Sequence, residues 1–543
     1  MLGNVPAATH RTRGRIWSLR RAEQIALTAI TTAIAACFLA QVAIERRPLY
    51  YGNQHTYFPA GLARAGQEYL QADWFAGTRP PHVAFTYLVE ILARLDILGA
   101  GVAAIQTLLE VALLAAIWLV LAGIHRQLLA GQPGSERAWL ALTTASFSLI
   151  VLGMQYEGAP LDLISDHAGE EVVNLGQTWE HTFRLEGLAH QYIWGRYLQP
   201  SEFGILILLA IGVMLFERWR LGALLCGAAT IMHAGYLPHA GLLVLVGAAW
   251  LYRGGRRRTA LETLVIYGIC ALPVAVYALS FSFDPGRAEA LDILANFRVP
   301  HHAQPEEWWS TIALGKLGAI GVASLLALRH RASFLSWVLV IGFGFTIAGI
   351  IGLWYLIDSD ALAMSFPWRV SVYLVPVSLC VIVAVAVTAI ARLLRLASER
   401  PSVLPWLAAI TGMLVLLSTG SRTLEARPRP RGGTRAEIAA LVRRHTRATD
   451  VILVPEHWEE FRLEARRPIY VDFKSHPYKP SEVIEWRRRI QVSRRFYTGT
   501  PKRRDEICAG GEFDYYIISG EALIEPHRAI AEQDGYRLVA CPA

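Results

Sequence analysis

Three arginines lie close to the ends of long apolar runs, beside aromatic or histidine residues. Arg196 follows Trp-Gly, Arg298 precedes Val-Pro-His-His, and Arg369 follows Pro-Trp. A guanidinium group is planar and donates paired hydrogen bonds that match the oxygens of a phosphate. A charge at the edge of hydrocarbon also needs a partner that offsets it. We therefore expect these three arginines to converge on a bound phosphate, although phospholipid headgroups or nearby acids would offset them as well.

Three histidines lie near the same run ends. His233 ends an apolar run, in the turn His-Ala-Gly-Tyr-Leu-Pro-His, where an unsatisfied polar group is costly and usually functional. His301 and His302 are adjacent in the densest polar and aromatic cluster of the chain. The three histidines are candidates for substrate binding; the alternative for the adjacent pair is a hydrogen-bonded position on the surface of a loop.

The richest group of acids follows the third apolar run. Asp162 and Asp166 are four residues apart, and His167 comes next. If this stretch is helical, the two carboxylates share a face and can hold a hard divalent cation such as Mg²⁺ or Mn²⁺. Asp162 and Asp166 are also candidates for catalysis, and the alternative is a solvated acidic loop.

Eleven apolar runs separate these polar segments, and several are long enough to cross the ~30 Å hydrocarbon core as helices. A mean hydropathy of +0.34 over 543 residues indicates a membrane protein with a soluble part. The sequence thus predicts an α-helical polytopic membrane protein with about 11 transmembrane helices. The runs are Ile25–Ile44, Val102–Ile124, Trp139–Leu152, Phe203–Phe216, Leu221–Ala234, Leu237–Tyr252, Leu264–Phe281, Leu317–Leu328, Phe334–Leu356, Val370–Ile390 and Leu404–Leu417.

Arginine clusters occupy alternate gaps between these runs, for example at 253–258 and 392–400. Because short loops rich in Lys and Arg stay in the cytoplasm, we expect a bacterial cytoplasmic membrane protein with residues 1–22 inside and a bundle over 23–419. A formal charge of +8 is explained by this anchoring and does not favour nucleic-acid binding. The segments expected on the outer face are the loops 46–101, 153–202, 284–316 and 358–369 and the soluble region 420–543.

The soluble region alternates short helical and strand-like stretches, which predicts a small α/β domain with a parallel sheet. Cys508 and Cys541 both lie there, and an oxidising exterior would allow a disulfide between them. The basic stretch 487–504 is either a solvated or lipid-facing surface or a clamp for an anion. The expected helices cover 434–446, 481–489 and 521–532, and the expected strands cover 451–455, 468–473, 515–518 and 537–540.

This layout resembles the GT-C superfamily of membrane glycosyltransferases, which have a long first external loop, many spans and an exported carboxy-terminal domain. Here that loop begins Tyr-Gly-Asn-Gln-His-Thr-Tyr-Phe after the first run. The resemblance implies a polyprenyl-phosphate-linked sugar as donor and a catalytic acid just after the first span. That position reads Asn53-Gln54-His55, so the catalytic role falls to Asp73 further along the loop, falls to His55, or is lost.

Two functions compete on these grounds. The first is a GT-C-like glycosyltransferase that transfers a sugar to a glycan, lipid or protein acceptor, with a carboxylate as base and arginine or a cation at the leaving phosphate. The second is a non-catalytic membrane component of polysaccharide assembly or export that keeps the lipid-phosphate groove. The acidic second loop favours the first, and the missing acid at residues 53–55 favours the second.

Overall fold

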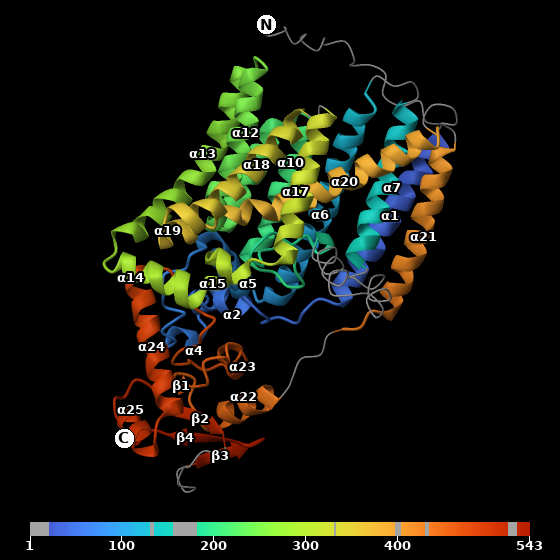
Figure 1. Ribbon diagram of the computed structural model, residues 1–543. Helices are drawn as coiled ribbons and strands as arrows, with labels where there is room; N and C mark the ends of the chain where they lie inside the picture. The colour runs from blue at the N-terminus through green and yellow to red at the C-terminus, as the bar shows by residue number, and fades with distance from the viewer. Residues whose placement is uncertain are drawn as a thin grey trace.

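A computed structural model describes residues 21–130, 135–155, 182–330, 333–396, 403–428, 434–519 and 529–542. Figure 1 shows long, roughly parallel helices forming a bundle, with a small domain packed against one end of it. Short helices lie between the two parts. The described helices and sheet therefore match the fold class that the apolar runs and the tail predict.

Each of the eleven apolar runs forms a helix in the described part of the chain. Among the described residues, nine helices are long and apolar enough to cross a membrane, and two are shorter. Many of their outward-facing leucines, isoleucines and valines are exposed, as expected of surfaces that face lipid. The nine are α1 (Arg21–Ile44), α6 (Leu98–Leu128), α7 (Ser135–Gln155), α12 (Leu237–Arg253), α13 (Arg257–Ser280), α17 (Thr311–Arg329), α18 (Ser333–Ile351), α20 (Ser371–Leu393) and α21 (Leu404–Glu425), and the shorter two are α10 (Ile205–Leu215) and α11 (Trp219–Met232).

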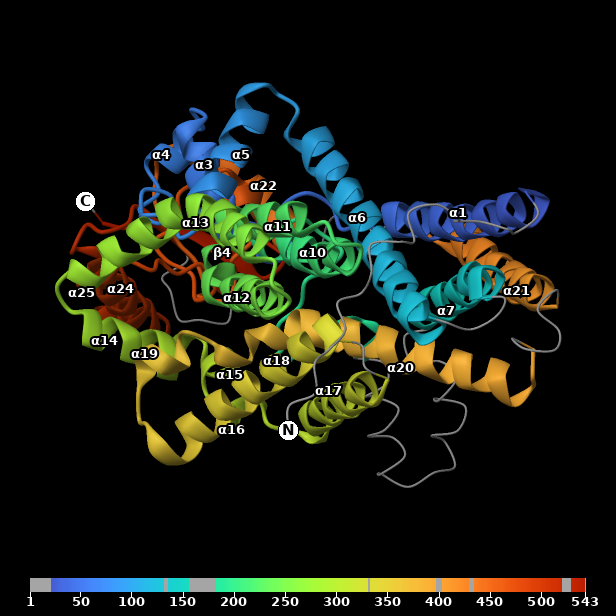
Figure 2. The ribbon, with the colours of Figure 1, turned by 90° about the horizontal axis from the view of Figure 1, so that it is seen from above.

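The helices of the bundle pack in groups, and α17, α18 and α20 contact one another in one of them. In Figure 2, which looks onto the bundle, α1, α7 and α21 lie together on one side, and these three contact one another. Helices α10, α11, α12 and α13 form another group, and α6 contacts both α10 and α7. The polar loops that join these helices at the domain end of the bundle are thereby brought close to one another.

Short helices fill these loops at the domain end of the bundle. Hydrogen bonds tie loops from distant parts of the sequence together: the Trp368 indole donates to the His302 carbonyl (3.0 Å), and the Leu188 amide donates to the Ser371 hydroxyl (2.7 Å). The short helices are α2 (Gln54–Tyr57), α3 (Pro59–Arg64), α4 (Glu68–Gln71), α5 (Val83–Arg94), α14 (Arg287–Asp292), α15 (Pro300–Ala303), α16 (Pro305–Trp308) and α19 (Asp360–Ala363), with a π-helical turn over Ile293–Arg298 and 3₁₀ turns over Pro200–Gly204, Ala234–Tyr236, Phe281–Phe283 and Pro367–Val370.

The carboxy-terminal domain is built on a four-stranded sheet of order β1-β2-β4-β3. Only β1 and β2 pair in parallel, whereas β4 is antiparallel to both of its neighbours. The disulfide Cys508–Cys541, which an oxidising exterior would allow, is formed. The elements are α22 (Thr434–His445), β1 (Ile452–Leu453), α23 (Phe461–Ala465), α24 (Pro480–Thr498), α25 (Pro501–Cys508), β2 (Tyr515–Ser519), β3 (Ala529–Gln533) and β4 (Tyr536–Ala540).

Two expectations about this sheet are wrong. Residues 529–533 form a strand rather than the end of a helix, because Asp534 and Gly535 both adopt positive φ and make a two-residue hairpin turn. Residues 468–473 are not a strand; their one ladder contact is a bridge between Ile469 and Ile452. An Asp-Gly pair is a strong hairpin signal, and it makes the sheet mixed rather than parallel.

The domain shares a hydrophobic core with the bundle's loops. Ala290, Ile293 and Leu294, from α14 and the π-helical turn, are buried in one cluster with Val483 and Trp486 of α24. Burial of this apolar surface fixes the domain against the loop over residues 284–316. The domain is therefore held in place where the bundle's polar loops meet.

Candidate functional site

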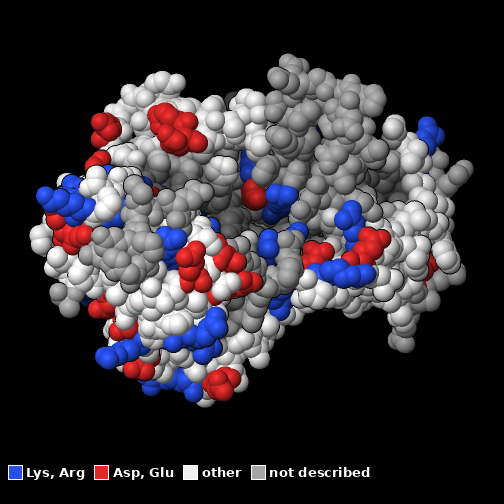
Figure 3. Space-filling model, turned by 90° about the horizontal axis from the view of Figure 1, so that it is seen from below, with Lys and Arg blue, Asp and Glu red and all other residues white. Residues whose placement is uncertain are grey.

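A cavity of about 470 Å³ lies between the bundle's loops and the carboxy-terminal domain. Figure 3, which views the molecule from the domain side, shows basic and acidic side chains intermingled on this face. Five segments of the bundle and two of the domain meet at the cavity. Its lining residues are Asn53, Thr56, Tyr57, His190, Gln191, Tyr192, Gln199, Ser201, His233, Tyr236, Arg298, Val299, His301, His302, Met364, Phe366, Arg369, Val372, Glu456, His457, Glu459, Phe473, Lys474, His476 and Tyr478.

Two of the three arginines expected to converge line this cavity. Arg369 donates from Nε to the Gln191 side chain (3.1 Å), and Arg298 donates from Nη2 to the Lys474 carbonyl (2.7 Å). Within the described ranges neither guanidinium has a carboxylate partner, and Nε of Arg298 has no hydrogen-bond acceptor. Burial lowers the pKa of Arg298 below its ordinary value. The pair thus presents positive charge to the cavity and leaves donors for an anion.

The backbone around Arg369 is built to place its guanidinium. Phe366 adopts the left-handed conformation (φ +48°), which turns the chain before Arg369, and the adjacent Trp368 side chain is fully buried. A Cβ at Gly235 would lie 2.1 Å from Nη1 of Arg369, so a side chain there would displace the guanidinium from its present position. The left-handed Phe366 and the close approach of Gly235 together define where the guanidinium lies.

The three predicted histidines also line the cavity. His233 stacks on His82, with ring centroids 4.3 Å apart, and His302 contacts the Ala189 carbonyl through Nδ1 (2.6 Å). Burial lowers the pKa of His302 to about 3, and burial together with Arg298 lowers that of His301. These imidazoles are therefore neutral at pH 7 and can donate or accept hydrogen bonds from a polar ligand.

The domain adds cavity residues that the sequence alone did not single out. They include two carboxylates, Glu456 and Glu459, and one cation, Lys474. Glu456 and Glu459 lie in the segment Val-Pro-Glu-His-Trp-Glu-Glu, which follows β1 directly. Polar residues at the end of a strand are a recurrent sign of a site, but nothing in the sequence showed that this strand end faces the bundle.

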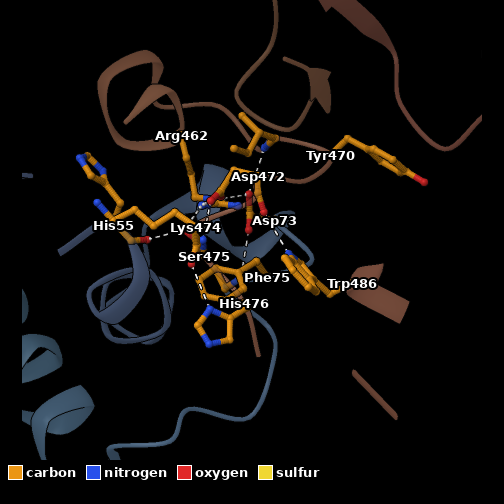
Figure 4. Close-up of polar contacts among 12 residues, drawn as sticks. His55, Asp73, Phe75, Arg462, Tyr470, Asp472, Lys474, Ser475, His476 and Trp486 are labelled. Carbon is orange, nitrogen blue, oxygen red and sulfur yellow. Dashed lines mark hydrogen bonds and ion pairs between the residues drawn. The ribbon is translucent and has the colours of Figure 1, made fainter. Parts of the chain in front are cut away.

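Asp73 does not line the cavity, contrary to its expected place. Its carboxylate accepts from Nε of Arg462 (2.7 Å) and from the Ile469 amide (3.0 Å). Arg462 also donates to Asp472 (2.9 Å), and all three side chains are at most 2% exposed. Figure 4 shows the Arg462 side chain reaching Asp73 and Asp472, and its guanidinium lies over the ring of Phe75. Asp73 is enclosed by the domain, so its observed contacts are those of a docking residue.

His55 is also buried outside the cavity. Its Nδ1 has no hydrogen-bond partner in the described part of the chain, and its carbonyl accepts from the Ser475 hydroxyl (3.3 Å). Burial first, and then Lys474 and Arg462, lower the pKa of His55 to about 3. Of the stretch where an acid was expected, Asn53 is the residue that faces the cavity, and its amide donates to Gln199 (2.8 Å).

Arg196 does not join the other two arginines. It lies 3.6 Å from Glu45 and lines a different cavity, of about 670 Å³, beside α1, α7 and α21. The expectation that all three arginines converge is therefore wrong for Arg196. The expected metal ligands Asp162, Asp166 and His167 lie outside the described residues, and no group of three metal-ligating side chains occurs among those that are described.

The basic stretch 487–504 of the domain is largely neutralised by its own acids. Arg488 pairs with Glu485 and Glu512, Arg494 pairs with Glu456, and Arg503 pairs with Glu506. This pattern supports the solvated surface rather than the anion clamp. The cavity between the domain and the bundle is thus the better candidate for binding an anion.

Comparisons with known proteins give a consistent but distant picture. Residues 435–492 match a family described as a domain of unknown function, DUF6798. The chain is similar to ArnT from Cupriavidus metallidurans in the apo state, with 13% identity, a TM-score of 0.38 and coverage of 94% of this chain and 97% of that one. A search of curated proteins gives no significant match.

A second similar structure is the oligosaccharyltransferase AglB from Archaeoglobus fulgidus, in complex with an inhibitory peptide and a dolichol-phosphate. Its identity is 11% and its TM-score 0.35, over 92% of this chain and 70% of that one. Both neighbours are GT-C glycosyltransferases, the superfamily that the layout of the sequence resembles.

Proposed function

We propose that the chain is a GT-C-like glycosyltransferase that binds a polyprenyl-phosphate-linked sugar in the cavity. The observation that carries the proposal is the pair Arg298 and Arg369, whose guanidinium groups face the cavity without a carboxylate partner among the described residues. Uncompensated charge is costly unless an anion offsets it on binding. A phosphate provides that charge and the matching hydrogen-bond geometry.

The surroundings of the arginines suit the rest of such a ligand. Met364, Phe366 and Val372 bring apolar surface to the cavity next to the start of α20, where a polyprenyl chain would leave toward lipid. Tyr57, Tyr192 and the neutral histidines provide hydrogen-bonding groups for a sugar. Cationic, hydrogen-bonding and apolar side chains in one cavity thus support the proposed ligand.

In this function Arg298 and Arg369 act on the phosphate that leaves the sugar. When the bond between the sugar and the phosphate breaks, the phosphate gains a negative charge, and Arg298 and Arg369 stabilise it. The reaction takes place at the outer face of a bacterial cytoplasmic membrane, in envelope glycan or glycoconjugate assembly, with a glycan, lipid or protein as acceptor. A divalent cation held by Asp162, Asp166 and His167 is part of the same proposal, and dialysis against EDTA with readdition of Mg²⁺ or Mn²⁺ tests it.

A binding measurement tests the phosphate site. The full chain in nanodiscs is titrated with undecaprenyl phosphate, with undecaprenol and with phosphatidylglycerol. We expect saturable binding of undecaprenyl phosphate alone, and release of undecaprenyl phosphate from at least one member of a panel of undecaprenyl-phosphate-linked sugars. Equal binding of undecaprenol, or displacement by phosphatidylglycerol, would contradict a dedicated phosphate site.

One observation favours a second function. Asn53, not an acid, faces the cavity from the loop where the GT-C resemblance implies a catalytic carboxylate. A non-catalytic component of polysaccharide assembly would bind undecaprenyl phosphate but would release none from any linked sugar. The two functions thus share the binding result and differ in turnover.

A further inference from the structure

The segment between β1 and α23 contributes Glu456 and Glu459 to the cavity. They are the two carboxylates among the described residues that line it. The backbone of this segment is fixed by Trp458, which is 2% exposed and packs on Phe461 and Tyr536. The Trp458 amide donates to the Pro455 carbonyl (2.9 Å) and completes a turn. The two carboxylates are therefore held in place rather than carried on a loose loop.

The two carboxylates have different partners. Both oxygens of Glu456 accept from Arg494, at 2.9 and 3.0 Å, in a paired arrangement that neutralises the charge. Glu459 accepts from Lys474 through Oε1 only, at 3.3 Å. Among the described residues Oε2 of Glu459 has no partner, so it can accept a hydrogen bond from a ligand.

Glu459 is also close to the proposed phosphate site. Lys474 contacts Glu459 through its ammonium group, and its carbonyl accepts from Arg298 (2.7 Å). One residue thus connects the carboxylate with a guanidinium that faces the cavity. Transfer of a sugar needs this juxtaposition, because a base must stand beside the attacked carbon while a cation stands beside the leaving phosphate.

We propose that Glu459 of the carboxy-terminal domain is the general base for the acceptor, in place of an acid of the first external loop. This inference rests on the proposed glycosyl transfer. The acceptor oxygen forms a bond to the anomeric carbon, and its proton passes to Oε2 of Glu459. The bond from the anomeric carbon to the phosphate oxygen breaks, and its electron pair leaves with the polyprenyl phosphate.

The test compares Glu459→Gln with a matched control in the full chain. Glu460→Gln changes the next residue, which pairs with Arg435 and is not among the cavity-lining residues. Two quantities are measured in nanodiscs: the Kd of undecaprenyl phosphate, and the release of undecaprenyl phosphate from a panel of its linked hexoses and pentoses with acceptor extract. The pH dependence of that release is recorded from pH 5 to pH 9.

We expect Glu459→Gln to keep the Kd within about twofold and to lose on the order of 100-fold or more in turnover, with loss of the acidic limb of the pH profile. Glu459→Asp should keep part of the activity, and Glu460→Gln all of it. Undiminished turnover in Glu459→Gln would overturn the assignment of Glu459 as base but not the proposed transfer. A loss of undecaprenyl phosphate binding equal to the loss of turnover would do the same. Binding without release from any sugar in the wild type would overturn the proposed transfer and the base together.

Discussion

Arg462 and the pair Arg298 and Arg369 show two different uses of arginine at the same boundary between bundle and domain. Arg462 is 1% exposed and lies between Asp73 and Asp472, whereas Arg298 and Arg369 face a cavity and have no carboxylate partner among the described residues. Burial alone would lower the pKa of Arg462, but the two carboxylates outweigh it and raise the pKa above its ordinary value. For Arg298 burial prevails and lowers the pKa. Arg462 thus has its counter-charges inside the protein, and the cavity pair needs one from outside.

The largest change in the free energy of unfolding should come from removing Arg462, whose charge is paired with two carboxylates. Arg462→Met leaves Asp73 and Asp472 buried without a cation, which we expect to cost about 3–5 kcal/mol and to release the domain from the first loop. The measurement is the thermal unfolding midpoint in detergent together with protease sensitivity of the domain. Arg488→Met, which removes an exposed pair with Glu485 and Glu512, is the control and should cost under about 1 kcal/mol. Equal destabilisation by Arg462→Met and Arg488→Met would show that the buried ion pairs of Arg462 matter no more than exposed ones.

The uncompensated cavity arginine should behave in the opposite way. Arg369→Met is expected to weaken undecaprenyl phosphate binding on the order of 100-fold, since charge-assisted hydrogen bonds to the phosphate are lost. The unfolding midpoint should stay the same or rise, because no buried acid loses its partner. Arg196→Met, in the other cavity, is the control and should bind normally. A strongly lowered midpoint for Arg369→Met would place it in the same class as Arg462.

A smaller loss of affinity should follow when the position of Arg369 is changed without removing its charge. Gly235→Ala keeps every charge but places a methyl group 2.1 Å from the present position of Nη1 of Arg369, so the guanidinium must move. We expect about a tenfold loss of affinity for undecaprenyl phosphate. Gly344→Ala on α18, where a Cβ would meet no atom within 4 Å, should leave the affinity unchanged. An unchanged affinity for Gly235→Ala would show that the precise place of Arg369 is unimportant.

The smallest effect concerns His55, which lies near the positive charges of Lys474 and Arg462. Its pKa is lowered to about 3, so the folded chain keeps His55 neutral while the unfolded chain takes up a proton below about pH 6.5. Lowering the pH from 7.5 to 5.5 therefore favours unfolding, by about 1 kcal/mol for this residue. His55→Leu should reduce the drop in unfolding midpoint between these pH values. A drop identical to that of the wild type would mean that His55 does not contribute.

The bundle and half of the cavity could be predicted because their signals are local. Each apolar run forms a helix by its own hydrophobicity, and the polar exceptions at run ends are visible in the sequence: Arg298, Arg369, His233, His301 and His302. The same argument failed for Arg196, because a position near a run end does not say which cavity the residue faces.

The contribution of the domain could not be predicted, because it depends on docking. Nothing around Glu459 or Lys474 in the sequence shows that these residues meet the loop over residues 284–316. Asp73 is expected at the cavity as an acid further along the first loop, but its partner, Arg462, lies 389 residues away. Contacts of such separation are set by tertiary packing and have no local pattern.

That separation also orders the events of biosynthesis. During translation Asp73 emerges long before Arg462. The Asp73 carboxylate therefore lacks this partner while most of the bundle is synthesised. The cavity gains Glu459 and Lys474 only when the domain has folded, and the disulfide of the domain includes the still later Cys541. A nascent or truncated chain would thus present half a cavity, and any transfer activity would switch on only at the last stage of maturation.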